Sequence, residues 1–183
     1  MQKVPTTLEY SILGLISLGK ASRYDIHRIF ADSPMGQYSS SPGSIYPALD
    51  RLANRGLLTA EFDPKQNMRR RKTFALTSLG EHTLHCWLAE AVTLEEIQSD
   101  IRTSLLRFSF MGGNRTTNQV IAYLESFREH LKTYLADLQA RRKTFREMTA
   151  LYAYLAMDNG VRAIRSHIRW VESTRNELLK RDK

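Results

Sequence analysis

The chain has 183 residues, of which 42% are hydrophobic and 25% are charged, and this balance predicts folded globular domains rather than a disordered chain. The formal net charge of +8 favours a polyanionic partner, and the single cysteine, Cys86, excludes an internal disulfide framework and a multi-cysteine zinc site. The N-terminal apolar stretch is too short to span a bilayer, so we expect a cytoplasmic protein with no membrane partner.

Two capped helices are predicted in the first part of the chain. Thr6 and Glu9 have the spacing of a capping box, and apolar residues then recur at helical spacing. Ser22 and Asp25 repeat the capping pattern at the start of a shorter helix, which should end before Pro34.

A third helix is predicted to end at Gly56. It has two possible starts. Ser41 is a good N-cap with Pro42 at the first helical position, but that start leaves Pro47 inside the helix, whereas a start at Ser44 places Pro47 in the first turn. One side of this helix is apolar, and the free face with its flanks comprises Gly43, Ser44, Tyr46, Pro47, Asp50, Arg51 and Asn54.

A strongly basic hairpin follows the third helix. Residues 57–62 and 73–76 have strand patterns, and the run 65–72 between them carries five cationic side chains. Residues 1–63, by contrast, contain six basic and six acidic side chains, so the excess charge is concentrated at the hairpin tip. A basic hairpin directly after short helices is typical of the wing of a winged helix-turn-helix, where the tip binds phosphate.

A fourth helix, capped by Thr77 or Ser78, closes the first half, and three long helices are predicted from residue 94 onwards. The last two of these carry apolar residues at alternating steps of three and four, a seam that requires a partner helix. We predict dimerisation through this seam, by Leu124, Phe127, Leu131, Leu138, Leu155, Val161, Ile164, Ile168 and Val171.

Three blocks, residues 8–16, 43–57 and 74–80, resemble PadR-type transcriptional regulators, and the C-terminal half resembles the helical domain of the PadR subgroup that is similar to the virulence activator AphA. The resemblance implies a homodimer that binds an inverted-repeat operator in double-stranded DNA, usually as a repressor. The fold expected is mainly α: a winged helix-turn-helix with a two-stranded β wing over residues 1–92, then an all-α dimerisation domain over residues 93–183.

The expected DNA contacts come from the third helix, its N-terminus and the wing. Arg23 stands where many members of the family have glycine, and it either contacts phosphate or is a solvated charge; Arg51 either contacts DNA or pairs with a neighbour on the surface. The predicted DNA-binding residues are Arg23, Ser41, Ser44, Tyr46, Pro47, Arg51, Lys65, Arg69, Arg70, Arg71 and Lys72.

Other functions are less well supported by the sequence. It contains no glycine-rich phosphate loop, nucleophile elbow or paired carboxylates in a plausible cleft, so we expect neither an enzyme nor a cofactor. His82 and Cys86 have a spacing that can hold a metal, but the sequence offers no second pair of ligands and no metal is expected. Two alternatives remain open, a transcriptional activator and a winged-helix adaptor that binds proteins. A small-molecule effector is a further hypothesis, based on family precedent and on the aromatic residues of the C-terminal half.

Overall fold

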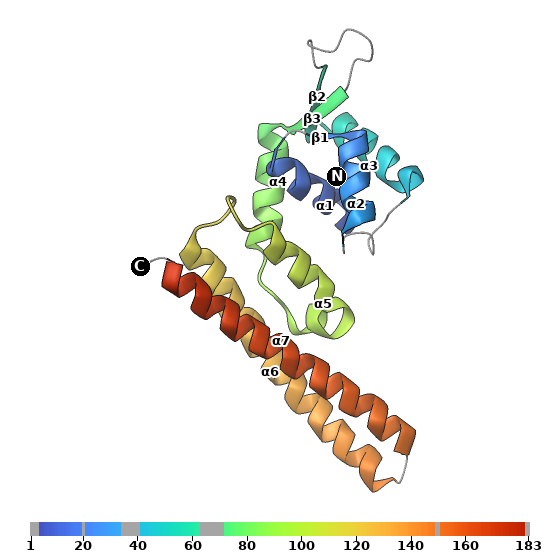
Figure 1. The fold of residues 1–183 in the computed structure, drawn as a ribbon, viewed down its shortest axis with the longest axis vertical. Coiled ribbons are helices and arrows are strands. Elements are labelled where there is room, and N and C mark those ends of the chain that lie inside the picture. Colours follow the sequence, from blue (N-terminus) through green and yellow to red (C-terminus); the bar gives the residue numbers. More distant parts are fainter. Residues whose placement is uncertain (1–3, 20, 34–40, 63–71, 149–150, 182–183) are drawn as a thin grey trace. The chain divides into compact units, whose positions relative to one another are not determined.

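The computed structural model describes residues 4–19, 21–33, 41–62, 72–148 and 151–181 (Figure 1). The chain divides into two compact units, Met1–Ala89 and Glu90–Lys183. The expected boundary after residue 92 lies in the short link between the last helix of the first unit and the first helix of the second.

The described residues of the N-terminal unit form four helices and three short strands. In chain order these are α1 (Thr7–Ser17), β1 (Ala21–Ser22), α2 (Arg23–Asp32), α3 (Pro42–Asn54), β2 (Leu58–Phe62), β3 (Lys72–Leu76) and α4 (Ser78–Ala89). Both predicted capping boxes are present, because the Thr6 and Ser22 hydroxyls accept hydrogen bonds from the backbone N–H groups of Glu9 and Asp25, at 3.2 Å each.

The strands form one antiparallel sheet in the order β1-β3-β2. The predicted hairpin corresponds to β2 and β3, which pair from Leu58 opposite Leu76 to Phe62 opposite Lys72. The predicted two-stranded wing is confirmed, and β1, which was not predicted, adds a third strand on the other edge of β3. A two-residue strand has too little alternation to be detected from its sequence pattern.

The core of this unit lies between the helices and the sheet, and side chains from α1, α2, α3, β3 and α4 fill it. Its completely buried members include Ile12, Ile26, Leu49, Phe74 and Leu84. α4 approaches the sheet so closely that a Cβ atom at Gly80 would lie 2.1 Å from the Leu57 carbonyl oxygen. Glycine at this position therefore sets the distance between α4 and the start of the wing.

In the C-terminal unit, the part of the chain that is described forms three helices, α5 (Leu94–Ser109), α6 (Thr117–Glu147) and α7 (Leu151–Arg181). The prediction of three long helices is confirmed. Figure 1 shows α6 and α7 side by side as a long antiparallel pair, and the seam between them includes the fully buried Leu124, Phe127, Leu131, Val161 and Val171. α5 is kinked at Asp100, whose φ of −156° and ψ of 83° are not helical.

A buried cluster of polar side chains connects α5 to α6. The Arg107 guanidinium, only 3% exposed, pairs with Glu90 and Glu96 at 3.2 Å each. The Ser104 hydroxyl donates to the Glu96 carboxylate, and the Tyr123 hydroxyl of α6 donates to the Ser104 carbonyl oxygen at 2.8 Å. Burial raises the pKa of Tyr123 to about 12, so this phenol remains a hydrogen-bond donor throughout the neutral range.

Candidate nucleic-acid interface

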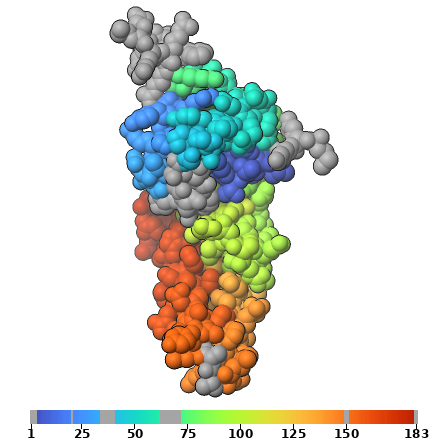
Figure 2. Space-filling view, turned by 90° about the vertical axis from the view of Figure 1, so that its right-hand side faces the viewer, coloured from blue at the N-terminus to red at the C-terminus, as the bar shows by residue number. Residues whose placement is uncertain are grey.

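The face of α3 that points away from the core is the centre of the candidate interface. The helix starts at Pro42 with Ser41 as N-cap, which resolves the two starts left open by the sequence and leaves Pro47 inside the helix. Pro47 has no N–H group to donate to the Gly43 carbonyl oxygen, which would be its partner in the helix. Both residues are exposed, so water can bind this carbonyl and the loss is tolerated. Figure 2 shows residues of α3, in cyan, on the surface of the N-terminal unit.

The N-terminal end of α3 is well suited to bind an anion. The Ser41 side chain accepts a hydrogen bond from the Gly43 backbone N–H at 3.2 Å, and Ser41, Gly43 and Ser44 are all exposed. Because the helix dipole places partial positive charge at this end, a phosphate oxygen would be stabilised here. The two predicted serine contacts are therefore accessible on the same turn.

Arg23 has partners on α3. Its guanidinium forms an ion pair with the Asp50 carboxylate and lies over the Tyr46 ring, with 5.5 Å between the guanidinium carbon and the ring centroid. The side chains of Arg23 and Asp50 are 37% and 49% exposed, so the cluster lies at the surface. Arg23 is therefore engaged on the protein itself, and neither interpretation made from the sequence anticipated this pairing.

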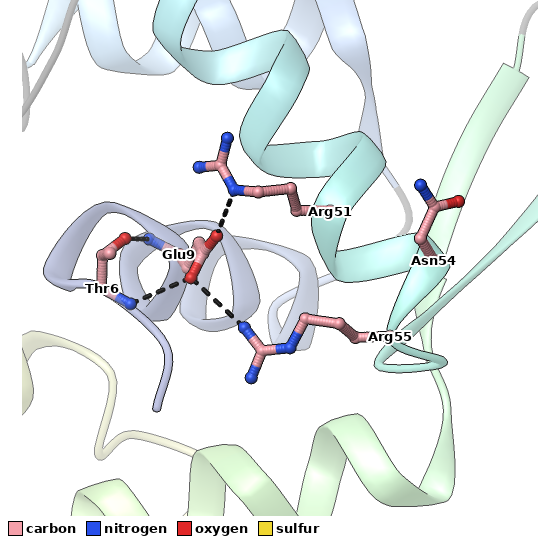
Figure 3. A pocket seen from close by; sticks show the side chains of 5 residues that line it. All are labelled: Thr6, Glu9, Arg51, Asn54 and Arg55. Atoms are coloured by element: carbon pink, nitrogen blue, oxygen red, sulfur yellow. Dashed lines mark hydrogen bonds and ion pairs between the residues drawn. The ribbon is translucent and has the colours of Figure 1, made fainter. Parts of the chain in front are cut away.

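Glu9 connects the start of α1 to the end of α3 (Figure 3). One carboxylate oxygen accepts from Arg51 Nε at 2.9 Å, and the other accepts from the Thr6 backbone N–H at 3.0 Å and pairs with Arg55 at 3.4 Å. Together with Asn54, these residues line an open pocket of about 430 Å³. Of the two roles left open for Arg51, pairing with a neighbour is present, although its side chain is still 53% exposed.

The Glu9 carboxylate is held in its charged form. Burial alone raises its pKa, but the Thr6 backbone hydrogen bond and the Arg51 guanidinium outweigh that effect, so the pKa of Glu9 lies below its ordinary value of 4.5. At neutral pH the carboxylate is ionised and the connection between α1 and α3 is complete.

The strands of the wing are described, whereas most of its predicted phosphate contacts are not. Lys72 at the start of β3 is half-buried, and its Nζ lies 5.5 Å from the centroid of the Phe74 ring. Lys65, Arg69, Arg70 and Arg71 lie outside the described residues. Because Phe62 pairs with Lys72, these four cations belong to the connection between the two strands.

The predicted dimerisation residues lie mainly in the seam between α6 and α7 of one chain. Leu124, Phe127, Leu131 and Val171 have no exposed surface, and neither has Val161. These side chains are therefore covered by a helix of the same chain. The periodicity of the sequence alone cannot distinguish this arrangement from packing against a second chain. Leu138 and Ile164 are also buried and Ile168 is half-buried, whereas Leu155 is 51% exposed.

The apolar tip of the C-terminal unit is exposed. It comprises side chains at the end of α6 and the start of α7, which are between 51% and 86% exposed: Met148, Leu151, Tyr152 and Leu155. Exposed apolar residues that cluster in this way mark an interaction surface more often than scattered ones do.

A second open pocket lies within the C-terminal unit, with a volume of about 480 Å³. Its apolar lining comes from Tyr134, Leu138, Phe145 and Met157, and its polar lining from Gln98, Asp137 and Arg141. Arg141 Nε donates to the Asp137 carboxylate at 3.0 Å.

Among the residues that the structure describes, no group of three or more His, Cys, Asp or Glu side chains could hold a metal ion. Cys86 Sγ lies 3.5 Å from His82 Nε2 in an exposed pair on α4. No helix within the described ranges is long and apolar enough to cross a membrane.

Two connections at this interface were not predicted from the sequence. Glu9 was assigned only to a capping box. Its position beside the apolar residues of α1 was the one indication in the sequence that its carboxylate is buried and therefore needs charged partners. Asp50 was placed on the free face without a partner. Its contact with Arg23 joins residues far apart in the sequence, and helical periodicity carries no information about such pairs.

Two family models match this chain. Residues 12–86 match the transcriptional regulator PadR-like family, and residues 102–178 match the virulence activator alpha C-terminal model. The Negative transcriptional regulator PadR of Bacillus subtilis (strain 168) is 35% identical over 94 residues, which are 51% of this chain and 51% of that relative. The match therefore spans about half the length of this curated relative.

Solved structures give lower similarity over more of the chain. Bacillus subtilis PadR in complex with operator DNA has a TM-score of 0.45 and 24% identity, covering 94% of this chain and 99% of that chain. The PadR-like transcriptional regulator BC1756 from Bacillus cereus has a TM-score of 0.43 and 23% identity, covering 97% and 99%.

Proposed function

We infer from the match of residues 12–86 to the PadR-like family that this chain is a transcriptional regulator of that family, and we propose that it is a homodimeric repressor that binds an inverted-repeat operator. α3 enters the major groove, its N-terminus and the wing contact phosphates, and the C-terminal unit joins the two protomers. The observation that carries this proposal is the exposed face of α3, with exposed serines at its N-terminus, beside a β hairpin whose connection contains four cations.

Repression is proposed because the curated relative is a negative transcriptional regulator. The sign of regulation depends on where the operator lies relative to the promoter, so activation is the alternative at the same DNA site. The adaptor alternative is less well supported, because a protein-docking surface does not require the cations of the run 65–72.

Dimerisation is proposed to involve the apolar tip, since these exposed side chains would be removed from water by a second copy. A symmetric dimer would place its two α3 helices against half-sites about 34 Å apart, or a multiple of that distance. Inverted repeats are the DNA sequences that match such two-fold symmetry.

The test is competition between two duplexes of equal length and composition, one from the region upstream of the gene and one scrambled. We expect a preference of about 10³-fold or more for the upstream duplex, because base contacts distinguish specific from non-specific binding on that scale. Equal affinity for the two duplexes would contradict sequence-specific regulation at that site, and binding to neither duplex would favour the adaptor alternative.

We further propose that a small-molecule effector binds the C-terminal unit. The pocket lined by Tyr134, Phe145 and Arg141 supports this part of the proposal. Aromatic walls with a nearby guanidinium suit a small aromatic acid. Thermal-shift screening of phenolic acids should find a compound that raises the unfolding temperature of the protein, with a smaller rise for Phe145→Ala. A library without any stabilising compound would count against this site.

A further inference from the structure

The exposed face of α3 carries a carboxylate, that of Asp50. Asp50 lies on the same side of α3 as the exposed Gly43, Pro47 and Asn54, and its side chain is 49% exposed. A carboxylate that faces DNA is repelled by the phosphates, and like-charge contact at an interface opposes binding strongly. A DNA-binding helix with this residue therefore needs something to neutralise it.

Arg23 supplies that neutralisation from a different helix. It is the first residue of α2, its guanidinium is ion-paired with the Asp50 carboxylate, and the same guanidinium lies over the Tyr46 ring. Tyr46 and Asp50 are one turn apart on α3, so a single side chain contacts two neighbouring positions of the candidate DNA-binding face.

We propose that Arg23 acts in DNA binding through Asp50, by neutralising this carboxylate and by holding Tyr46 in place on α3, rather than as an independent phosphate contact. This inference rests on the proposed function, and it assigns Arg23 as a positioning residue within it. Arg23 and Asp50 then form a matched pair, and the loss of either has a consequence that depends on the other.

The two roles of Arg23 predict different results for combined substitutions. An independent phosphate contact makes Arg23→Gln equally harmful whatever occupies position 50, and it lowers the salt slope of binding by about one. Neutralisation makes Arg23→Gln harmful mainly because Asp50 becomes an unpaired negative charge, so removal of that charge by Asp50→Asn should restore affinity.

The experiment is a double-mutant cycle on the full chain, with anisotropy measurements on the upstream and scrambled duplexes. We expect Arg23→Gln to weaken binding about tenfold, and Arg23→Gln with Asp50→Asn to bind within about threefold of the wild type, a coupling of the size that contacting charged residues show. The double variant should also keep the wild-type salt slope. Circular dichroism and thermal unfolding establish that each variant is folded.

Arg28→Gln is the matched control, because Arg28 is an exposed arginine on the same helix and its loss changes the net charge equally. Its effect on binding should be unchanged by Asp50→Asn. A double variant as weak as the Arg23→Gln variant, or one that has lost one unit of salt slope, would overturn this inference and leave the proposed function intact. A wild-type protein that binds neither duplex would overturn the proposed function and this inference with it.

Discussion

At the scale of single residues, Glu9 is a buried charged residue of the N-terminal unit. Its side chain is 4% exposed and joins Thr6, Arg51 and Arg55, so one carboxylate caps α1 and holds the C-terminal part of α3. A buried charge of this kind is tolerated only when it has partners, and removal of the charge leaves those partners unsatisfied. Glu9 therefore contributes to the orientation of α3 relative to α1.

Glu9→Gln should lower the free energy of unfolding at pH 7 by about 1–3 kcal/mol, because it replaces charge-assisted hydrogen bonds with neutral ones in a buried site. Urea unfolding monitored by circular dichroism measures this change. Glu81→Gln, at an exposed carboxylate of the same unit, is the control and should change the free energy by no more than about 0.5 kcal/mol.

The same pair of proteins should differ in their response to acid. The pKa of Glu9 is lowered by folding, so its stabilising effect is complete above its ordinary value of 4.5 and disappears as the pH falls through the lower pKa of the folded state. The stability difference between the wild type and Glu9→Gln should therefore shrink as the pH is lowered below about 4.5. A difference that stays constant down to pH 2 would show that the charge of Glu9 is not what stabilises the unit.

At the scale of elements, the local signals in the sequence were sufficient to predict helices and were insufficient to assign their partners. The capping boxes at Thr6 and Ser22 and the positive φ of Gly56, at 69°, lie where the sequence placed helix ends. The seam residues were predicted to face another helix, and most of them are buried where α6 and α7 of the same chain pack together, whereas Leu155 is exposed. Periodicity identifies the buried face of a helix and leaves open what covers it.

Two leucines of the C-terminal unit differ in what covers them. Leu131→Ala should lower the free energy of unfolding by about 2–5 kcal/mol, because it leaves a cavity in the seam between α6 and α7. Leu155→Ala should have little effect on the fold of the protomer, since its side chain is 51% exposed, and should instead weaken the dimer.

Chemical unfolding measures the first effect, and light scattering over a dilution series measures the second. If Leu155→Ala dissociates at the same concentration as the wild type, the dimer interface does not use the apolar tip. A Leu131→Ala protein as stable as the wild type would show that the seam tolerates a cavity.

At the scale of the whole molecule, the net charge does not locate the DNA-binding site, whereas the fold does. The net charge of +8 is spread over both halves, since residues 1–92 contain 11 basic and 8 acidic side chains and residues 93–183 contain 16 and 11. What distinguishes the N-terminal unit is the position of its cations, in the connection between the paired strands β2 and β3. A dimer that contacts six to ten phosphates should lose roughly 10³-fold to 10⁵-fold in affinity between 50 and 200 mM salt.

The most direct measurement is the salt dependence of DNA binding, followed by fluorescence anisotropy, for the wild type and for a variant in which Arg69, Arg70 and Arg71 are replaced by alanine. A second variant with Lys132, Lys143 and Arg146 replaced by alanine removes the same charge from exposed positions on α6 and serves as the control. We predict steep salt dependence for the wild type and the control, and a slope shallower by about three per protomer for the wing variant, on specific and scrambled duplexes alike. A wing variant that retains the affinity and salt slope of the wild type would contradict the central claim that this winged helix binds DNA through its wing.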